Sequence, residues 1–74
     1  MDIVFTSHAK TRMLQRKITE AEIESVIGSP ETTQETFKER IAARKKMAKG
    51  TLEVIYGKSE NKFIIVTCYW TKEA

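Results

Sequence analysis

The chain has 74 residues, with 13 Lys and Arg against 10 Asp and Glu, and a formal net charge of +3. This length predicts one small domain over residues 1–74. Its core must be thin, because so short a chain buries only about 60% of the surface that its unfolded form exposes. No apolar run approaches the roughly 18 residues of a membrane span, and the first residues lack the pattern of a secretion signal. We therefore expect a soluble, cytoplasmic protein with no membrane partner.

The chain contains one cysteine, Cys68, and one histidine, His8. An internal disulfide is impossible, and one copy cannot assemble a structural zinc site. Cys68 lies in a strongly apolar segment and is expected to be an inert small hydrophobe. The three glycines are isolated, which excludes a phosphate-binding loop of the Walker or Rossmann type. We therefore predict no metal site and no cofactor.

Charge is distributed unevenly along the chain. Residues 18–37 carry five glutamates and no Lys or Arg, whereas residues 38–49 carry six cations against Glu39 alone. A second basic block, which contains Lys10, Arg12, Arg16 and Lys17, precedes the acidic one. Two basic blocks around an acidic block indicate a bipolar molecule with one face suited to phosphates. The alternative is a surface that is merely solvated.

The first residues predict a short strand followed by a helix. Residues 3–5 form an apolar run typical of a brief edge strand, and Thr6 or Ser7 can cap a helix over residues 7–17. Near-helical spacing predicts a buried stripe of Ala9, Met13, Leu14 and Ile18.

A second helix is expected immediately afterwards. Thr19 followed by Glu22 is typical of a capping box, and the apolar face consists of Ile23, Val26 and Ile27. Gly28 can cap the end of this helix, and the Pro30 ring prevents its continuation.

Beyond Pro30 the pattern becomes extended. We expect a polar edge strand at 31–37, further strands at 40–48 and 52–56, a turn at 57–62, and a last strand at 63–71 whose residues 63–69 are central. The segment 40–48 is ambiguous, since its composition favours helix while its alternation favours strand, and we choose strand. The alternation places Ile41, Ala43 and Met47 on one side and Arg40, Ala42, Arg44 and Lys46 on the other. The predicted class is α+β, with two N-terminal helices packed on one face of an antiparallel sheet of about four strands.

Cations that alternate along one strand project from one sheet face about 6.6 Å apart, similar to the separation of phosphates in a nucleic-acid strand. Such a row, with Tyr56, Tyr69 or Trp70 nearby to stack on bases, is one way to hold single-stranded RNA. The alternatives are a solvated row that keeps a sheet edge from pairing and aromatic rings that only pack the core.

His8 carries the one side chain whose ordinary pKa, about 6.5, suits proton transfer near neutral pH. Arg12 lies one helical turn away. Cleavage of a phosphodiester by the adjacent 2′-hydroxyl needs a base, an acid and cations. These kinds of group are supplied here by His8, Arg12, Arg44, Lys46 and a Tyr or Thr hydroxyl. The alternative is that His8 is a capping or surface residue.

Four segments resemble a known group of small, mostly uncharacterised prokaryotic and phage domains. They are His8-Ala9-x-x-Arg12-Met13, Arg16-Lys17-Ile18-Thr19, Leu52-x-Val-Ile and Ile65-Val-Thr-Cys-Tyr. That group is regarded as related to the fold shared by barnase, EndoU, the tRNA-cutting colicins and the RelE mRNA-cleaving toxins. The resemblance implies a RelE/barnase-like architecture and, in many relatives, metal-independent RNA cleavage.

By matching positions, the resemblance implies five catalytic candidates, in which Lys46 is the alternative to Arg44 as the basic residue of the middle strand: His8, Arg12, Arg44, Thr67 and Tyr69. Three further cations are candidates for RNA binding: Arg16, Arg40 and Lys46. The leading hypothesis is a toxin-like ribonuclease acting on single-stranded RNA or tRNA. The alternatives are a non-catalytic RNA-binding module and an interaction protein whose basic face meets an acidic partner such as an antitoxin.

Overall fold

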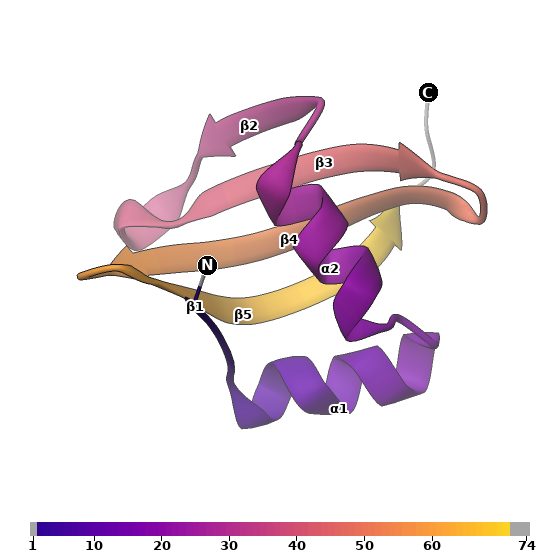
Figure 1. Cartoon of the computed structure of the whole chain (residues 1–74), viewed down its shortest axis with the longest axis horizontal. Helices are drawn as coiled ribbons and strands as arrows, with labels where there is room; N and C mark the ends of the chain where they lie inside the picture. The colour runs from indigo at the N-terminus through magenta and orange to yellow at the C-terminus, as the bar shows by residue number, and fades with distance from the viewer. Residues whose placement is uncertain (1, 72–74) are drawn as a thin grey trace.

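The computed structural model describes residues 2–71, in which two helices pack against a five-stranded sheet (Figure 1). The elements in chain order are β1 (Asp2–Phe5), α1 (Ser7–Arg16), α2 (Glu20–Gly28), β2 (Thr32–Glu35), a 3-10 turn (Phe37–Glu39), β3 (Ile41–Met47), β4 (Gly50–Ser59) and β5 (Lys62–Thr71). The predicted α+β class is confirmed. None of the helices described is long and apolar enough to cross a membrane.

The strands lie in the order β1-β5-β4-β3-β2, and every neighbouring pair is antiparallel except β1 with β5. The sheet has five strands rather than about four because the brief N-terminal run joins it as the parallel neighbour of β5. The middle strand is β4, so the prediction that 63–69 would be central is wrong. Since β1 is only four residues long, β5 has a strand on both sides only from Lys62 to Ile65.

Two predicted strand limits also change. The turn expected at 57–62 shrinks to Glu60 and Asn61, because residues 57–59 continue β4 and pair with β5. Glu60 adopts a left-handed backbone with φ of +57° to close this tight turn. The expected strand at 31–37 ends at Glu35, and Phe37 begins the 3-10 turn instead.

The first helix begins and ends at local signals in its sequence. The Thr6 hydroxyl accepts a 3.1 Å hydrogen bond from the amide of Ala9, and Lys17 ends the helix in a left-handed conformation. Ala9 and Ile18 are buried, but Leu14 is 84% exposed, so the predicted stripe is wrong at that position. Leu14 lies about 100° around the helix from Met13, which packs against the core, and it therefore faces solvent.

The core lies between the helices and one face of the sheet. Its fully buried side chains include Ile23 and Val26 from α2, Leu52 and Val54 from β4, and Ile65 and Cys68 from β5. Burying a large aliphatic side chain contributes roughly 1.5–3 kcal/mol. Alternation along β3 is confirmed by burial, since Ala43 is in this core while Arg44 and Lys46 are exposed.

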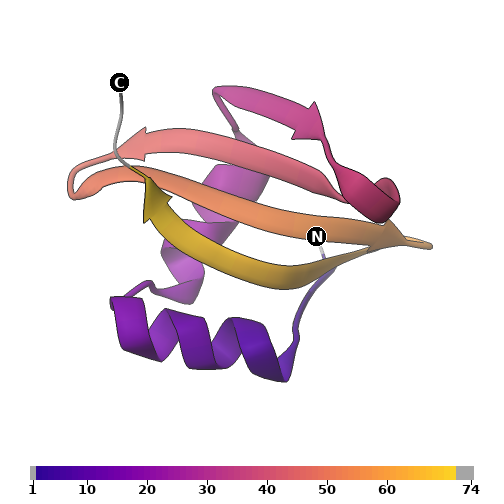
Figure 2. The ribbon, with the colours of Figure 1, turned by 180° about the vertical axis from the view of Figure 1, so that it is seen from behind.

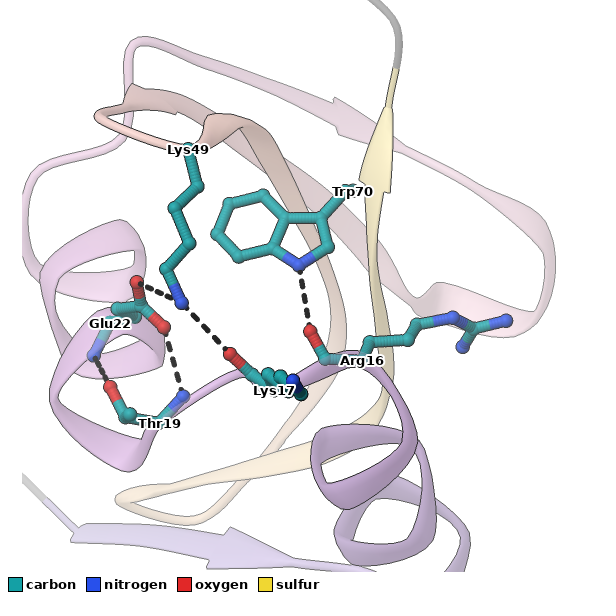
Figure 3. A network of polar contacts seen from close by, with 6 residues as sticks. All are labelled: Arg16, Lys17, Thr19, Glu22, Lys49 and Trp70. Atoms are coloured by element: carbon teal, nitrogen blue, oxygen red, sulfur yellow. Dashed lines mark hydrogen bonds and ion pairs between the residues drawn. The ribbon is translucent and has the colours of Figure 1, made fainter.

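Polar contacts fix the junction of the two helices against the β3–β4 hairpin (Figure 3). The Trp70 indole donates a 3.0 Å hydrogen bond to the carbonyl of Arg16, and the Lys49 ammonium donates a 3.1 Å bond to the carbonyl of Lys17. The same ammonium lies 5.5 Å from the Trp70 ring centroid. Two carbonyls at the end of α1 are thus bound by side chains that are distant in sequence, one on β5 and one in the β3–β4 turn.

The predicted capping box is present at the start of α2. The Glu22 amide donates to the Thr19 hydroxyl at 3.1 Å, and the Thr19 amide donates to the Glu22 carboxylate at 2.9 Å (Figure 3). The other oxygen of that carboxylate lies 3.7 Å from the Lys49 ammonium. The cap therefore also connects α2 to the hairpin.

Candidate functional site

The face of the sheet that turns away from both helices is left uncovered by them (Figure 2); we call it the open face. Directly opposite residues of an antiparallel pair lie on the same face. Arg44 lies opposite Glu53, and Glu53 lies opposite Tyr69. Three strands therefore place these side chains in one row across the open face, which we call the Glu53 row.

The Glu53 row is joined by charge-assisted contacts. The Arg44 guanidinium donates through Nε to Oε1 of Glu53, and the Tyr69 hydroxyl donates to Oε2 at 2.6 Å. The Glu53 side chain is 7% exposed, whereas the Arg44 side chain is 50% exposed. A buried carboxylate is tolerated only when it is paired and hydrogen-bonded. Arg44 and Tyr69 therefore hold Glu53 in one geometry, and Arg44 also reaches solvent.

The environment of Tyr69 changes its acidity. Burial, the hydrogen bond to Glu53 and the negative charge of Glu53 raise the pKa of Tyr69 to about 12, although the nearby Arg44 opposes this. The phenol therefore keeps its proton at neutral pH and acts as a hydrogen-bond donor.

A polar hollow of about 240 Å³ adjoins the Glu53 row. Its lining is mostly hydroxyl, amide and charged groups, and consists of Thr32, Thr33, Gln34, Thr36, Ala42, Arg44 and Glu53. The edge strand β2 thus forms one wall, while Arg44 and Glu53 form the other. A small polar or anionic group in the hollow would contact both a cation and a carboxylate.

Two other predicted residues lie on the same face. Lys46 is two residues from Arg44 on β3 and is exposed, and its amide donates a 3.2 Å bond to the Glu31 carboxylate. Thr67 is two residues from Tyr69 on β5, opposite Ile55, and is partly buried. Side chains two apart along a strand share a face. Arg44, Lys46, Thr67 and Tyr69 therefore share the open face.

The remaining predicted residues lie on or beside other elements. Arg12 donates through Nε to His8 at 3.4 Å and through Nη1 to Gln15 at 2.9 Å, all three on α1. Arg16 donates to the carbonyl of Cys68 at 3.2 Å, which satisfies part of the β5 edge that β1 does not reach. Arg40 is exposed and immediately precedes β3. These contacts form two separate groups, one at Glu53 and one on α1.

The aromatic residues divide between the two faces. Tyr56 is buried in the core, where its ring lies 5.4 Å from that of Phe63, centroid to centroid, at a tilt of 50°, while Trp70 faces the α1–α2 junction. Of the three predicted stacking candidates, Tyr69 lies on the open face.

A family described as "Domain of unknown function (DUF4258)" matches residues 5–70. The chain belongs to this family. Comparison with curated proteins found no match, and comparison with solved structures found none either. The expected membership of a small domain family without an assigned activity is confirmed, and the match includes all of the Glu53 row.

Glu53 is the one member of the Glu53 row that the sequence reasoning did not select. Its signal was present, because it is a lone carboxylate between Leu52 and Val54 in an otherwise apolar run. A charge in such a position requires a partner, and the alternation places it on the face opposite the core. Within residues 2–71, no group of three or more His, Cys, Asp or Glu side chains comes together as metal ligands would.

Proposed function

We propose that this chain binds single-stranded RNA on its open face and cleaves it without a metal ion, leaving a 2′,3′-cyclic phosphate. The observation that carries the proposal is the Glu53 row beside the polar hollow. A carboxylate, a guanidinium and a hydroxyl at one place are the group types that intramolecular phosphodiester cleavage uses. The net charge of +3 and the resemblance to RNA-cleaving relatives support the same substrate.

In the proposed reaction the 2′-oxygen of a ribose attacks the adjacent phosphorus, and Glu53 takes the hydroxyl proton. Arg44 stabilises the charge that grows on the phosphorane, since its guanidinium lines the hollow and is half exposed. The bond from phosphorus to the 5′-oxygen then breaks, the leaving oxygen takes a proton from solvent on the open face, and Glu53 later returns its proton to solvent. Tyr69 is a positioning residue, because its hydroxyl donates to the carboxylate.

The other cations extend the binding surface in this proposal. Lys46 lies two residues beyond Arg44 on the same face of β3, and Arg40 immediately precedes this strand. Thr67 is proposed to contact a phosphate or ribose oxygen beside the scissile bond, and Arg12 and Arg16 on α1 are proposed to contact phosphates farther along the RNA strand. Phosphate contacts of this kind position a nucleic acid without reading its sequence.

One observation favours a second candidate, a module that binds RNA without cutting it. Both oxygens of Glu53 already accept a hydrogen bond, one from Arg44 and one from Tyr69. In this candidate the carboxylate only anchors the guanidinium that contacts the phosphate, and it takes no proton. The two candidates share the face and the ligand and differ in the role of Glu53.

The decisive experiment incubates the purified chain with end-labelled single-stranded RNA from pH 5 to 9, with and without EDTA. We expect cleavage that EDTA does not affect and that 2′-deoxy substitution at the scissile nucleotide abolishes. Glu53→Gln should lower the rate by roughly 10²- to 10⁴-fold, the size of a general acid or base contribution. Glu24→Gln, the same change at an exposed position of α2, is the matched control and should cut like the parent.

The other outcomes are equally informative. Binding of RNA without cleavage at any pH would establish the second candidate. An unchanged rate in Glu53→Gln would remove Glu53 from the chemistry. Failure to bind RNA even at low salt, with co-purification of an acidic protein, would replace both proposals by an antitoxin-like partner on the basic face.

A further inference from the structure

Phe37 is a large apolar side chain that the fold does not bury. It lies at the tip of the β2–β3 connection and is 81% exposed. The other exposed large apolar side chains among residues 2–71 are Val4 on β1, at the opposite edge of the sheet, and Leu14 on α1. Phe37 is therefore an isolated ring at the β2 edge, rather than part of a broad apolar patch of the kind that protein partners cover.

The loop that carries Phe37 is held in a defined shape. Both the amide and the hydroxyl of Thr36 donate to the carbonyl of Arg40, at 2.7 and 3.2 Å, and so close the loop around Phe37. Lys38 and Glu39 both adopt left-handed backbones, with φ of +62° and +60°. Non-glycine residues seldom adopt this conformation, and two in succession reverse the chain tightly. The ring is therefore presented from a closed turn.

The surroundings of Phe37 suit a nucleic acid. The Lys38 ammonium lies 5.9 Å from the centroid of the ring, and Arg40 closes the same loop. Thr36, the residue before Phe37, is also part of the lining of the hollow beside Arg44 and Glu53. A ring with an ammonium over it, next to a hollow that contains a guanidinium, combines a stacking surface with phosphate ligands.

We propose that Phe37 is a stacking platform for an unpaired nucleobase of the RNA strand that lies on the open face. This inference rests on the proposed function, since it assigns a base-binding subsite to the same surface. The base stacks on the phenyl ring, and Lys38 and Arg40 contact the flanking phosphates. Stacking on a phenyl ring is tolerant of base identity, so the subsite distinguishes unpaired from paired RNA rather than one sequence from another.

The test measures the Kd of the full chain for two fluorescent octamers at fixed salt. One octamer is a 2′-O-methyl oligonucleotide, which the chain cannot cleave, and the other has the same backbone but lacks bases. Phe37→Ala should weaken binding of the base-bearing octamer by roughly 5- to 150-fold, the range for loss of one aromatic–base stack. Phe37→Tyr should restore it, and the abasic octamer should bind parent and Phe37→Ala equally.

Leu14→Ala is the matched control, because Leu14 is as exposed as Phe37 but lies on α1. It should leave both Kd values unchanged. Equal binding of the base-bearing octamer by parent and Phe37→Ala would overturn the inference, and so would equal weakening toward both octamers. Because no cleavage is measured, a base-dependent loss supports the subsite even if the Glu53→Gln experiment excludes catalysis. If the parent cleaves RNA but Phe37→Ala binds the base-bearing octamer as the parent does, the subsite is refuted and the proposed function stands.

Discussion

The phenol of Tyr69 donates a 2.6 Å hydrogen bond to Oε2 of Glu53 across the paired strands β4 and β5. This bond exists only while the phenol keeps its proton, so it adds to the larger effect of burial, and together they raise the pKa of Tyr69 to about 12. Proton binding at Tyr69 and folding are therefore linked. The contact can therefore be tested by measuring the free energy of unfolding as a function of pH, without a substrate.

We expect the free energy of unfolding to fall as the pH rises from about 10, the ordinary pKa of a tyrosine, to about 12. In this window the unfolded phenol has lost its proton while the folded one retains it, so unfolding becomes more favourable. Below pH 10 the stabilisation is fully present. Tyr69→Phe removes this titration and should show a shallower decline.

Denaturant unfolding at several pH values from 8 to 12, followed by circular dichroism, measures this difference. Burial also raises the pKa of Tyr56, so part of the alkaline decline should persist in Tyr69→Phe. The comparison between the two proteins cancels the effects of lysine titration. Identical declines in parent and variant would show that the Tyr69 proton is not coupled to folding.

Salt dependence of RNA binding should identify the face that meets phosphate. Each cation that displaces condensed counterions from a single strand contributes about −0.7 to the slope of log Kobs against log salt. Lys46→Gln should therefore reduce the magnitude of the slope by about 0.7, because Lys46 is exposed and lies two residues from Arg44 on the same face of β3.

Lys45→Gln is the control for that measurement. Lys45 is the preceding residue, but its ammonium donates at 2.9 Å to the hydroxyl of Ser25 on α2, on the helix side of the sheet. The same chemical change there should leave the slope as in the parent. A slope reduced by Lys45→Gln and not by Lys46→Gln would place the RNA on the other face.

Thr19→Ala should destabilise the chain by about 1 kcal/mol, the usual cost of losing a threonine N-cap. The Thr19 hydroxyl accepts from the Glu22 amide, and the substitution leaves that donor without its partner. Thr11→Ala is the same change at an exposed position inside α1 and should be slightly stabilising, because alanine has the higher helix propensity. Thermal melts followed by circular dichroism compare both with the parent; a Thr19→Ala protein that melts like Thr11→Ala would contradict the role of the cap.

Local signals were sufficient to predict most elements. The capping box at Thr19, the proline after α2 and the alternation along β3 each depend on neighbours in sequence. The order of the strands does not depend on sequence neighbours, because β1 pairs with β5, which lies about 60 residues later in the chain. The apolar character of 63–69 therefore suggested a central strand, although α1 and Arg16 cover part of that edge.

The candidate site divides in the same way. Arg44 and Tyr69 were selected from residue type and resemblance, and alternation correctly placed Arg44 away from the core. Their convergence on Glu53 depends on the register of three strands, which is fixed by two hairpin turns and a β-bulge near Ile55. Register is not visible in a single sequence, so Glu53 was recognised only when its partners were in place.

The two leucines on which sequence and structure can be compared most directly are Leu14 and Leu52. Both were placed in apolar patterns, yet Leu52 is fully buried and Leu14 is 84% exposed. Leu52→Ala should destabilise the chain by about 2–5 kcal/mol, through lost burial and the cavity that remains between β4 and the helices. Leu14→Ala deletes the same atoms at a position where they already contact solvent, and it should change the free energy of unfolding by less than about 0.5 kcal/mol. Denaturant unfolding measures both values in one experiment, and a loss above about 1 kcal/mol for Leu14→Ala would mean that α1 buries Leu14 in solution, for example against a second copy of the chain.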